Sequence, residues 1–279
     1  LIPLPLVAMT MALPALRRIP SGVVGDDSRA RLRGAVLLAA GAALLLAGLT
    51  QPNLLLLAPM VVGGGAVAIP ALRQLLPPGA LRARPGLPAA VLTMLLLNVV
   101  FFGIDAFLAL SLVDVRGRSI AFAGLAFTAA TITWTSGSWL QARLYGRVSR
   151  RALVRSGLTI LLLGGALLTS ILWRQVPVVV GIVGWGIAGL GIGLAYSTLS
   201  LVVLENASPG QEGEASASLQ LASVLGSGVG AGIGGAALNA IGHDRLDTAL
   251  FAQYAAMLAV LVFTLALSPR LPGRAPQAA

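Results

Sequence analysis

Long apolar runs, separated by short polar connections, constrain the fold of this chain more than any other feature of its sequence. A helix of about 17–25 apolar residues crosses the hydrocarbon core of a bilayer. Eight runs reach that length, at 34–50, 54–72, 89–113, 119–142, 156–173, 176–204, 215–238 and 249–268. Because lipid offers the backbone no hydrogen-bond partners, each run must satisfy its own peptide groups as a helix. The sequence therefore predicts an all-α, polytopic transmembrane helical bundle.

The small share of charged residues supports a membrane location. Only 10% of the 279 residues are charged, against about 25% in an ordinary soluble domain, and 57% are hydrophobic. The mean hydropathy is +0.92. Such a chain cannot bury its apolar side chains in one water-soluble core, so the lipid bilayer is its expected partner.

The positions of the arginines test the number of spans. All 19 basic residues are arginines, and if the connection at 17–33 is cytoplasmic, all but four of them fall on the cytoplasmic side. The four on the outer side are Arg116, Arg118, Arg174 and Arg245. This asymmetry is the one that the positive-inside rule describes for integral membrane proteins. We therefore expect a cytoplasmic C-terminus.

The residue types that are absent narrow the function. The chain has no cysteine, no lysine and one histidine, His243. Disulfides, thiolate metal sites and lysine Schiff bases are excluded, and a single histidine argues against a metal centre. The predicted spans hold one acidic residue, so no acid–base pair for catalysis is visible and we expect no enzymatic activity and no cofactor. The net charge of +10 does not indicate nucleic-acid binding, because the arginines lie between apolar runs rather than on a polar domain.

One carboxylate interrupts the apolar run at 89–113. Asp105 lies in the stretch NVVFFGIDAFLAL, about 6 Å from the middle of the run toward the outer side. Inserting an ionised aspartate at such a depth costs about 2.5–3.5 kcal/mol. A carboxyl held there can take a proton from one side and release it to the other, as an antiporter requires, or it can recognise a cation. The alternative is that Asp105 pairs with a hydroxyl or an arginine elsewhere, or reaches the outer interface.

Two helix faces are candidates for the wall of a substrate cavity. Asn98, Phe101 and Phe102 precede Asp105 on one helix, and a face of this composition suits a cavity better than lipid. On the next helix, small and hydroxyl residues recur at spacings of four and three residues: Gly124, Thr128, Thr131, Thr135 and Ser138. Trp134 and Trp139 flank this stripe. Hydroxyls and indoles together suit an amphipathic molecule. The alternative is that small hydroxyl residues serve only to pack helices closely.

The glycine-rich stretches and the charged connections have simpler interpretations. GWGIAGLGIG and GSGVGAGIGG lie inside apolar spans, which predicts close helix packing rather than phosphate loops. Three acidic residues are interpreted as a solvated face: Glu205, Glu212 and Glu214. We assign membrane topology, contact with anionic lipid or gating to the arginines of one predicted cytoplasmic loop: Arg143, Arg147, Arg150, Arg151 and Arg155. Weaker candidates for a cavity are Tyr196, Gln220, Gln253 and Tyr254.

The order of several segments along the chain is informative. LIPLPLVAMTMALPAL opens the chain and is followed by two apolar runs. LPPGALRARPGLPAAVL leads into the last six runs, and GSWLQARLYGRVSRRALVRSG is a basic stretch that contains Gln141. GQEGEASASLQLASVLGSGVGAGIGGAAL is rich in glycine.

In this order, the segments resemble the second half of a fourteen-span transporter of the major facilitator superfamily, in its drug:proton antiporter branch. The first segment is similar to the end of that family's sixth span, and the two runs after it resemble its extra central pair. The next two segments resemble the lead-in to its C-terminal domain and a basic cytoplasmic loop, whose pattern has an acid where Gln141 stands. The last resembles a glycine-rich fifth helix.

This resemblance implies an organisation and a function. Residues 1–16 would end a helix of an N-terminal half that is missing from this chain, and 17–88 would hold a cytoplasmic linker and two central helices. Residues 89–268 would form a six-helix transport domain, and 269–279 a cytoplasmic tail. The resemblance implies proton-coupled efflux of amphipathic drugs or metabolites, by alternating access, across a bacterial plasma membrane. The alternatives are a uniporter or metabolite permease of the same superfamily, and a permease subunit of a larger membrane complex.

Overall fold

The structure is a computed structural model that describes residues 26–49, 51 and 54–273. These residues form helices, turns and connections without a β-strand, and eight of the helices are long and apolar enough to cross a membrane. The prediction of an all-α, polytopic bundle is therefore confirmed. The partial run at 1–16 and residues 274–279 of the predicted tail lie outside the described residues.

Eight long helices make up the described fold. They are α2 (Asp26–Leu49), α3 (Leu54–Leu75), α4 (Leu87–Leu110), α5 (Ile120–Leu144), α6 (Arg150–Ser170), α7 (Val179–Glu205), α8 (Glu212–Ile241) and α9 (Leu246–Leu267). A π-helical turn, Ser111–Val115, extends α4, and short 3₁₀ turns flank several of the others. Each long helix corresponds to one predicted apolar run.

Local signals explain where these helices begin and end. The Ser119 hydroxyl accepts a hydrogen bond from the Phe122 N–H at 3.2 Å and caps α5. Ser149 caps α6 in the same way, accepting from the Ala152 N–H at 3.3 Å. Gly242 ends α8 with a φ of 94°, a conformation that favours glycine.

Two predicted boundaries are wrong by more than a turn. Helix α2 begins at Asp26, inside the connection predicted at 17–33. Helix α6 begins at Arg150, whereas the apolar run suggested 156. Arg150 and Arg151 therefore lie in the first turn of a helix and not in a loop. The apolar runs missed these turns because both contain arginines, which are polar yet favour helices. At α6, the capping Ser149 rather than hydrophobicity sets the start.

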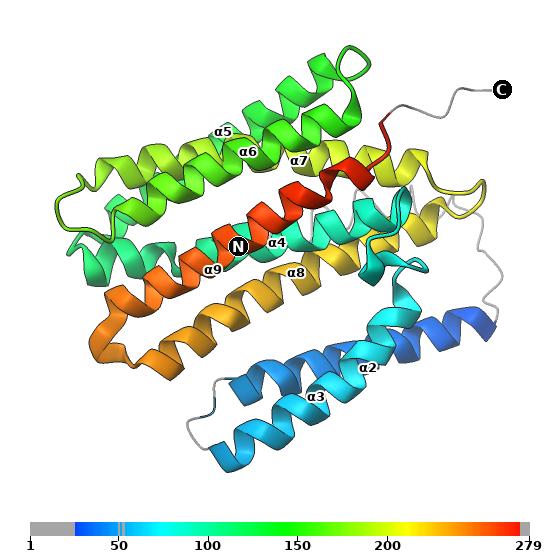
Figure 1. The fold of residues 1–279 in the computed structure, drawn as a ribbon, viewed down its shortest axis with the longest axis horizontal. Helices are drawn as coiled ribbons and strands as arrows, with labels where there is room; N and C mark the ends of the chain where they lie inside the picture. The colour runs from blue at the N-terminus through cyan, green and yellow to red at the C-terminus, as the bar shows by residue number, and fades with distance from the viewer. Residues whose placement is uncertain (1–25, 50, 52–53, 274–279) are drawn as a thin grey trace, which may run out of the picture.

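The helices form three groups (Figure 1). Helix α7 packs along α5 and α6, and α4 packs along α8 and α9. These two groups meet where α4 contacts α7 and where α6 contacts α9. Helices α2 and α3 pack along each other as a separate pair, which reaches the bundle mainly where α2 contacts α8. Residues on α4, α5 and α7 consequently face one another across the seam between the first two groups.

Glycines set the close approach of these helices. A Cβ placed on Gly193 of α7 would lie less than 3.0 Å from the Trp134 carbonyl oxygen of α5. On the other side of α7, a Cβ on Gly191 would lie equally close to the α6 backbone. On α8, a Cβ on Gly230 would meet the Val99 carbonyl oxygen of α4. The predicted packing role of both glycine-rich stretches is confirmed.

The described arginines segregate between the two ends of the bundle. One end, called here the arginine-rich end, carries Arg29, Arg31 and Arg33 in the first turns of α2, together with Arg73, Arg82, Arg84, Arg143, Arg147, Arg150, Arg151, Arg155 and Arg270. It lies at the right of Figure 1, where the α3–α4, α5–α6 and α7–α8 connections are. The opposite end carries Arg116, Arg118, Arg174 and Arg245. The arginines therefore divide between the two ends of the bundle as the sequence predicted.

Arg116 stabilises the opposite end of the bundle. It follows the π-helical turn of α4, and its guanidinium donates to carbonyl oxygens of the turn after α6: Ile171, Trp173 at 2.8 Å, Arg174 at 3.4 Å and Val176 at 2.8 Å. The final carbonyls of a helix have no partner within the helix and carry a partial negative charge. Arg116 satisfies the carbonyl oxygen of Ile171, the residue that caps the end of α6, and its bonds to the residues beyond the helix tie α4 to the α6–α7 connection.

Replacing Arg116 with glutamine should lower the free energy of unfolding by about 1.5–3 kcal/mol, the usual worth of hydrogen bonds from a charged donor. Thermal unfolding of the purified protein in detergent measures this loss. Arg118→Gln is the matched control, because the exposed Arg118 side chain forms no hydrogen bond or ion pair within the described residues and lies over the Phe122 ring, at 5.8 Å from its centre. If both variants unfold at the wild-type temperature, the contacts of Arg116 do not stabilise this end.

Candidate functional site

Asp105 is hydrogen-bonded in the structure and lies at the seam between α4 and α7. It is half-buried, and its Oδ1 accepts a hydrogen bond from the Trp185 indole N–H at 3.2 Å. Trp185 is fully buried in α7 and lies between Gly184 and Gly186. A buried indole N–H needs an acceptor, and the carboxylate supplies one. The carboxylate therefore supplies the acceptor that the buried indole N–H needs, and the indole supplies a hydrogen-bond donor to the half-buried carboxylate.

Aromatic rings from three helices gather beside this pair. Phe101 is the centre: its ring stacks on Trp185 with 4.7 Å between centroids and 15° between planes. Phe102 and Trp134 meet the same ring edge-on, at 5.3 Å and 5.2 Å. Tyr196 extends the cluster from Trp134 at 5.8 Å. We call these five residues the ring cluster; it joins α4, α5 and α7.

Polar side chains continue from the ring cluster toward α8. Asn98 is fully buried, and its Nδ2 donates to the Met94 carbonyl oxygen at 2.8 Å and, more weakly, to the Ser223 hydroxyl at 3.5 Å. That hydroxyl lies 3.2 Å from the Tyr196 hydroxyl. Within the described residues, Asn98 Oδ1 accepts no hydrogen bond. This buried amide oxygen of Asn98 therefore remains available to accept a hydrogen bond.

The hydroxyl stripe of α5 is arranged differently. Thr128, Thr131 and Thr135 are exposed, and each donates to a carbonyl oxygen four residues earlier, at 2.8, 2.9 and 3.1 Å. Ser138, half-buried, accepts from the Ser197 hydroxyl of α7 at 3.0 Å. The three threonines satisfy their donors within the helix and keep oxygen lone pairs for a partner. In the described structure they contribute to an open helix face rather than to tight packing.

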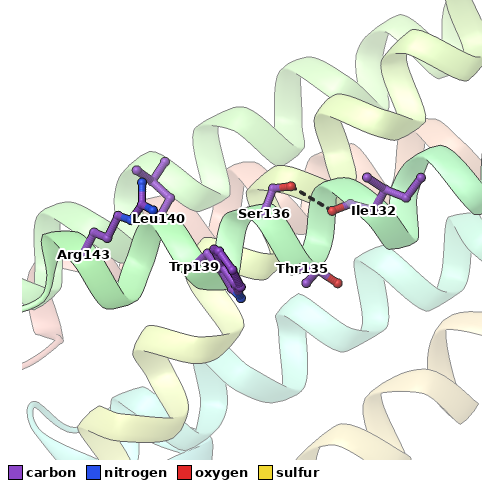
Figure 2. A pocket seen from close by; sticks show the side chains of 6 residues that line it. All are labelled: Ile132, Thr135, Ser136, Trp139, Leu140 and Arg143. Atoms are coloured by element: carbon purple, nitrogen blue, oxygen red, sulfur yellow. Dashed lines mark hydrogen bonds between the residues drawn. The ribbon is translucent and has the colours of Figure 1, made fainter.

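A pocket of about 550 Å³ opens on this face of α5. Figure 2 shows its side chains spread along the helix: Ile132, Thr135, Ser136, Trp139, Leu140 and Arg143. The Ser136 hydroxyl donates to the Ile132 carbonyl oxygen at 2.9 Å, and Trp139 is 67% exposed. The pocket combines apolar, hydroxyl, indole and guanidinium groups, which suits an amphipathic molecule.

The residues predicted to line one cavity thus divide between two places. Phe101 stacks on Trp185, and Phe102 and Trp134 contact Phe101. Asn98 is connected to the ring cluster through Ser223 and Tyr196. The three threonines lie on the open face of α5, and Thr135 lines its pocket. Sequence reasoning missed Trp185, because the surrounding glycines pointed to packing alone.

The four weaker candidates for a cavity lie in different parts of the structure. Tyr196 joins the ring cluster, whereas Gln220 is exposed on α8. Gln253 is buried and donates to the Gly103 carbonyl oxygen at 3.0 Å, which ties α9 to α4. Tyr254 is buried too, and its hydroxyl pairs with that of Ser111 at the end of α4. The last two hold the bundle together and do not reach the ring cluster through any hydrogen bond found here.

A second polar cluster lies at the arginine-rich end. Arg150 Nη2 lies 2.6 Å from Glu205 Oε2, and the Tyr145 hydroxyl donates to the other oxygen of that carboxylate. Arg150 Nε also donates to the Tyr145 hydroxyl at 2.9 Å. Burial, with the Glu205 carboxylate beside it, raises the pKa of the Tyr145 hydroxyl above its usual range. The cluster connects the beginning of α6 to the end of α7.

This cluster corrects the interpretation of Glu205 as a solvated face. The carboxylate is paired and only partly exposed, because the end of α7 packs against the α5–α6 connection. Gln141, on α5, is itself buried. The sequence did not predict this contact, because Tyr145 and Glu205 are 60 residues apart and belong to different predicted segments.

The other arginines of this end have distinct positions. Arg151 donates twice to the Leu271 carbonyl oxygen, from Nε at 3.1 Å and from Nη2 at 2.7 Å, and so holds the segment after α9. Arg143 lines the α5 pocket, and Arg147 is exposed in the α5–α6 connection. Arg150 and Arg151 therefore have structural partners, while Arg143 and Arg147 point to open surface.

The Asp105 site can bind charge and apolar surface together. A carboxylate attracts a cation or a proton, and the faces of aromatic rings attract cations and apolar bodies. No protein-family model matches the chain, and a search of curated proteins finds no match.

Proposed function

We propose that this protein is a secondary active transporter that exports amphipathic, cationic small molecules in exchange for protons. The observation that supports this function is the Asp105 carboxylate, held by the Trp185 indole beside a cluster of rings within a membrane-length helix. The ionised carboxylate attracts the cation, and the rings receive its apolar body. A proton bound to the same carboxyl removes the charge that holds the cation, so the two ligands compete.

The hydrogen bond from Trp185 connects this competition to the helix packing. A hydrogen bond to an ionised carboxylate is roughly twice as strong as one between neutral groups. Protonation of Asp105 therefore weakens the link between α4 and α7 at the seam where two helix groups meet. A cation that binds the carboxylate makes a different set of contacts there. Ligand exchange can bias two arrangements of these helices, as alternating access requires.

The packing order of α4–α9 supports a place in the major facilitator superfamily. Helix α8 packs along α4 as α5 packs along α7, and α9 packs along α4 as α6 packs along α7. Exchanging α4–α6 with α7–α9 therefore reproduces the main contacts, as an inverted repeat would. We assign these six helices to the C-terminal domain of such a transporter. Its N-terminal domain would face the open side of α5, and the arginine-rich end would be cytoplasmic in a bacterial plasma membrane.

Efflux of ethidium from energised cells that express the full-length protein tests this function. Cells with the protein should export the dye faster than cells with an empty vector, and an uncoupler should remove the difference. An anionic dye such as fluorescein is the matched substrate control and should not be exported. Export that persists with the uncoupler would favour a uniporter of the same superfamily, and no export of any cationic dye would contradict the proposal.

A further inference from the structure

The connection between α3 and α4, residues 76–86, has a defined shape. It contains the 3₁₀ turn η1 (Ala80–Arg82), flanked by Gly79 with a φ of 88° and Ala83 with a φ of 47°. The Arg82 and Arg84 N–H groups both donate to the Gly79 carbonyl oxygen, at 3.1 and 3.2 Å. A loop whose amides converge on one carbonyl presents its side chains in a fixed direction.

The end of α9 braces this connection. Arg270 Nη1 lies within hydrogen-bond distance of the Arg82 and Ala83 carbonyl oxygens, at 3.3 and 3.2 Å. The Gly86 N–H donates in return to the Arg270 carbonyl oxygen at 3.0 Å. The connection therefore belongs to the body of the bundle, and its side chains keep their places relative to α3 and α4.

Three arginines help to line an open cavity of about 460 Å³ beside this connection. The cavity is bounded by Arg73 of α3 and by residues of the connection: Leu76, Pro77, Gly79, Ala80, Leu81, Arg82 and Arg84. Among the described residues, no carboxylate forms an ion pair with any of these three arginines. Three arginines that line one cavity, with no carboxylate paired to them in the described part of the chain, make a site for an anion.

The site lies at the boundary between membrane and water. Helices α3 and α4 both have membrane length, and the connection joins their ends, at Leu75 and Leu87. Leu81 is 43% exposed beside the arginines, so an apolar group emerges next to the charges. A ligand there can place a charged group among the guanidiniums and an apolar group against exposed leucine and the flank of α3.

We propose that this cavity binds the phosphate group of an anionic phospholipid. Guanidinium groups bind phosphate oxygens in pairs, with a geometry that lysine cannot reproduce. The adjoining apolar surface favours a phospholipid over free phosphate, because an acyl chain can lie along α3 while the phosphate occupies the cavity. The bound lipid links α3, the α3–α4 connection and the end of α9 at one point. This role is independent of the substrate and of the coupling ion.

Native mass spectrometry of the full-length protein in detergent, titrated with dioleoyl phosphatidylglycerol, tests the proposal. Dioleoyl phosphatidylcholine is the reference lipid. The triple variant R73Q/R82Q/R84Q should bind phosphatidylglycerol about tenfold more weakly or worse. The matched control, R143Q/R147Q/R155Q, removes the same charge from exposed arginines at the same end. The sequence made these three candidates for contact with anionic lipid, but they do not line this cavity, so the control should bind as the wild type does. Equal loss in both variants, or loss in neither, overturns the proposal.

Gly79→Ala separates the shape of the site from its charge. A Cβ at Gly79 would lie less than 3.0 Å from the Arg84 side chain, and the φ of 88° disfavours any residue but glycine. This variant keeps every arginine, yet it should weaken phosphatidylglycerol binding several-fold. If Gly79→Ala binds phosphatidylglycerol as the wild type does, charge alone and not the shape of the cavity explains binding, and the proposal is overturned.

Inorganic phosphate distinguishes the two sources of the phosphate group. In large molar excess it should leave the phosphatidylglycerol complex intact, and displacement of the lipid would show that free phosphate is the ligand instead. Circular dichroism and gel filtration check that each variant is folded. If R73Q/R82Q/R84Q is not, R73K/R82K/R84K takes its place: it keeps the charge, and it should lose affinity because lysine cannot bind two phosphate oxygens at once. Unchanged affinity in the lysine variant overturns the proposal.

Discussion

Asp105→Asn should abolish uncoupler-sensitive efflux while the protein reaches the membrane in normal amounts. Asparagine has nearly the same shape and can still accept the hydrogen bond from the Trp185 indole, so the packing of α4 against α7 should survive. The amide cannot take up a proton or carry a negative charge. Hydrogen bonds to a charged partner are worth about 1.5–3 kcal/mol, so affinity for a cationic dye should fall about tenfold to a hundredfold. Efflux assays and dye binding to the purified variant measure the two effects.

Asp114→Asn is the matched control for this experiment. Asp114 lies nine residues further along the chain, in the π-helical turn that extends α4, and it is exposed. Removing its charge should leave efflux and dye binding unchanged. If Asp105→Asn exports the dye as the wild type does, Asp105 is a tolerated structural carboxyl. If the variant binds the dye with wild-type affinity but no longer exports it, Asp105 carries the proton and other groups recognise the cation.

Gly193→Ala should produce the largest loss of stability among single-methyl substitutions in α7. The added Cβ would meet the Trp134 carbonyl oxygen and the Ser138 backbone, and backbone atoms cannot move aside as a flexible side chain can. Overpacking of this kind costs about 3 kcal/mol. Because Trp134 belongs to the ring cluster, the displacement of α5 from α7 should also weaken dye binding. Thermal unfolding in detergent and dye titration report the two consequences.

Gly124→Ala controls for the effect of the methyl group itself. Gly124 lies within α5, and nothing stands within 4 Å of a Cβ built there. Alanine is favoured over glycine in a helix by about 1 kcal/mol, so this variant should be as stable as the wild type or slightly more stable. A similar loss of stability in both variants would mean that close contact between α5 and α7 does not explain the role of Gly193.

Periodicity and composition were sufficient to predict the helices, because lipid leaves an apolar run of this length few other structures. They also predicted the segregation of arginines and the glycine packing. They were less successful with polar partners, which depend on where separate helices meet. The Arg150–Glu205 pair shows the difficulty: the carboxylate looks solvated when its own connection is considered alone, and only the packing of α7 brings it to α6.

The partner of Asp105 could have been found by comparing depths. Asp105 lies 18 residues into α4, which begins at Leu87, and Trp185 lies 20 residues before the end of α7 at Glu205. Both helices are counted here from the arginine-rich end, so the two side chains differ in depth by only about 3 Å. A buried tryptophan N–H and a half-buried carboxylate at one depth are natural partners. Because the glycines around Trp185 indicate close helix packing, the sequence analysis did not consider Trp185 as a hydrogen-bond donor.

The long sequence separations around α4 have a consequence for biosynthesis. A chain is made from its N-terminus, so α4 enters the membrane before the helices that satisfy it. Trp185 follows Asp105 by 80 residues, Ser223 follows Asn98 by 125, and Gln253 follows Gly103 by 150. Helix α4, which carries Asp105, must therefore remain in the bilayer without these partners until α9 has emerged. A ribosome that stalls before α9 would leave an inserted but incomplete intermediate, whose exposed polar groups are what membrane quality control can recognise.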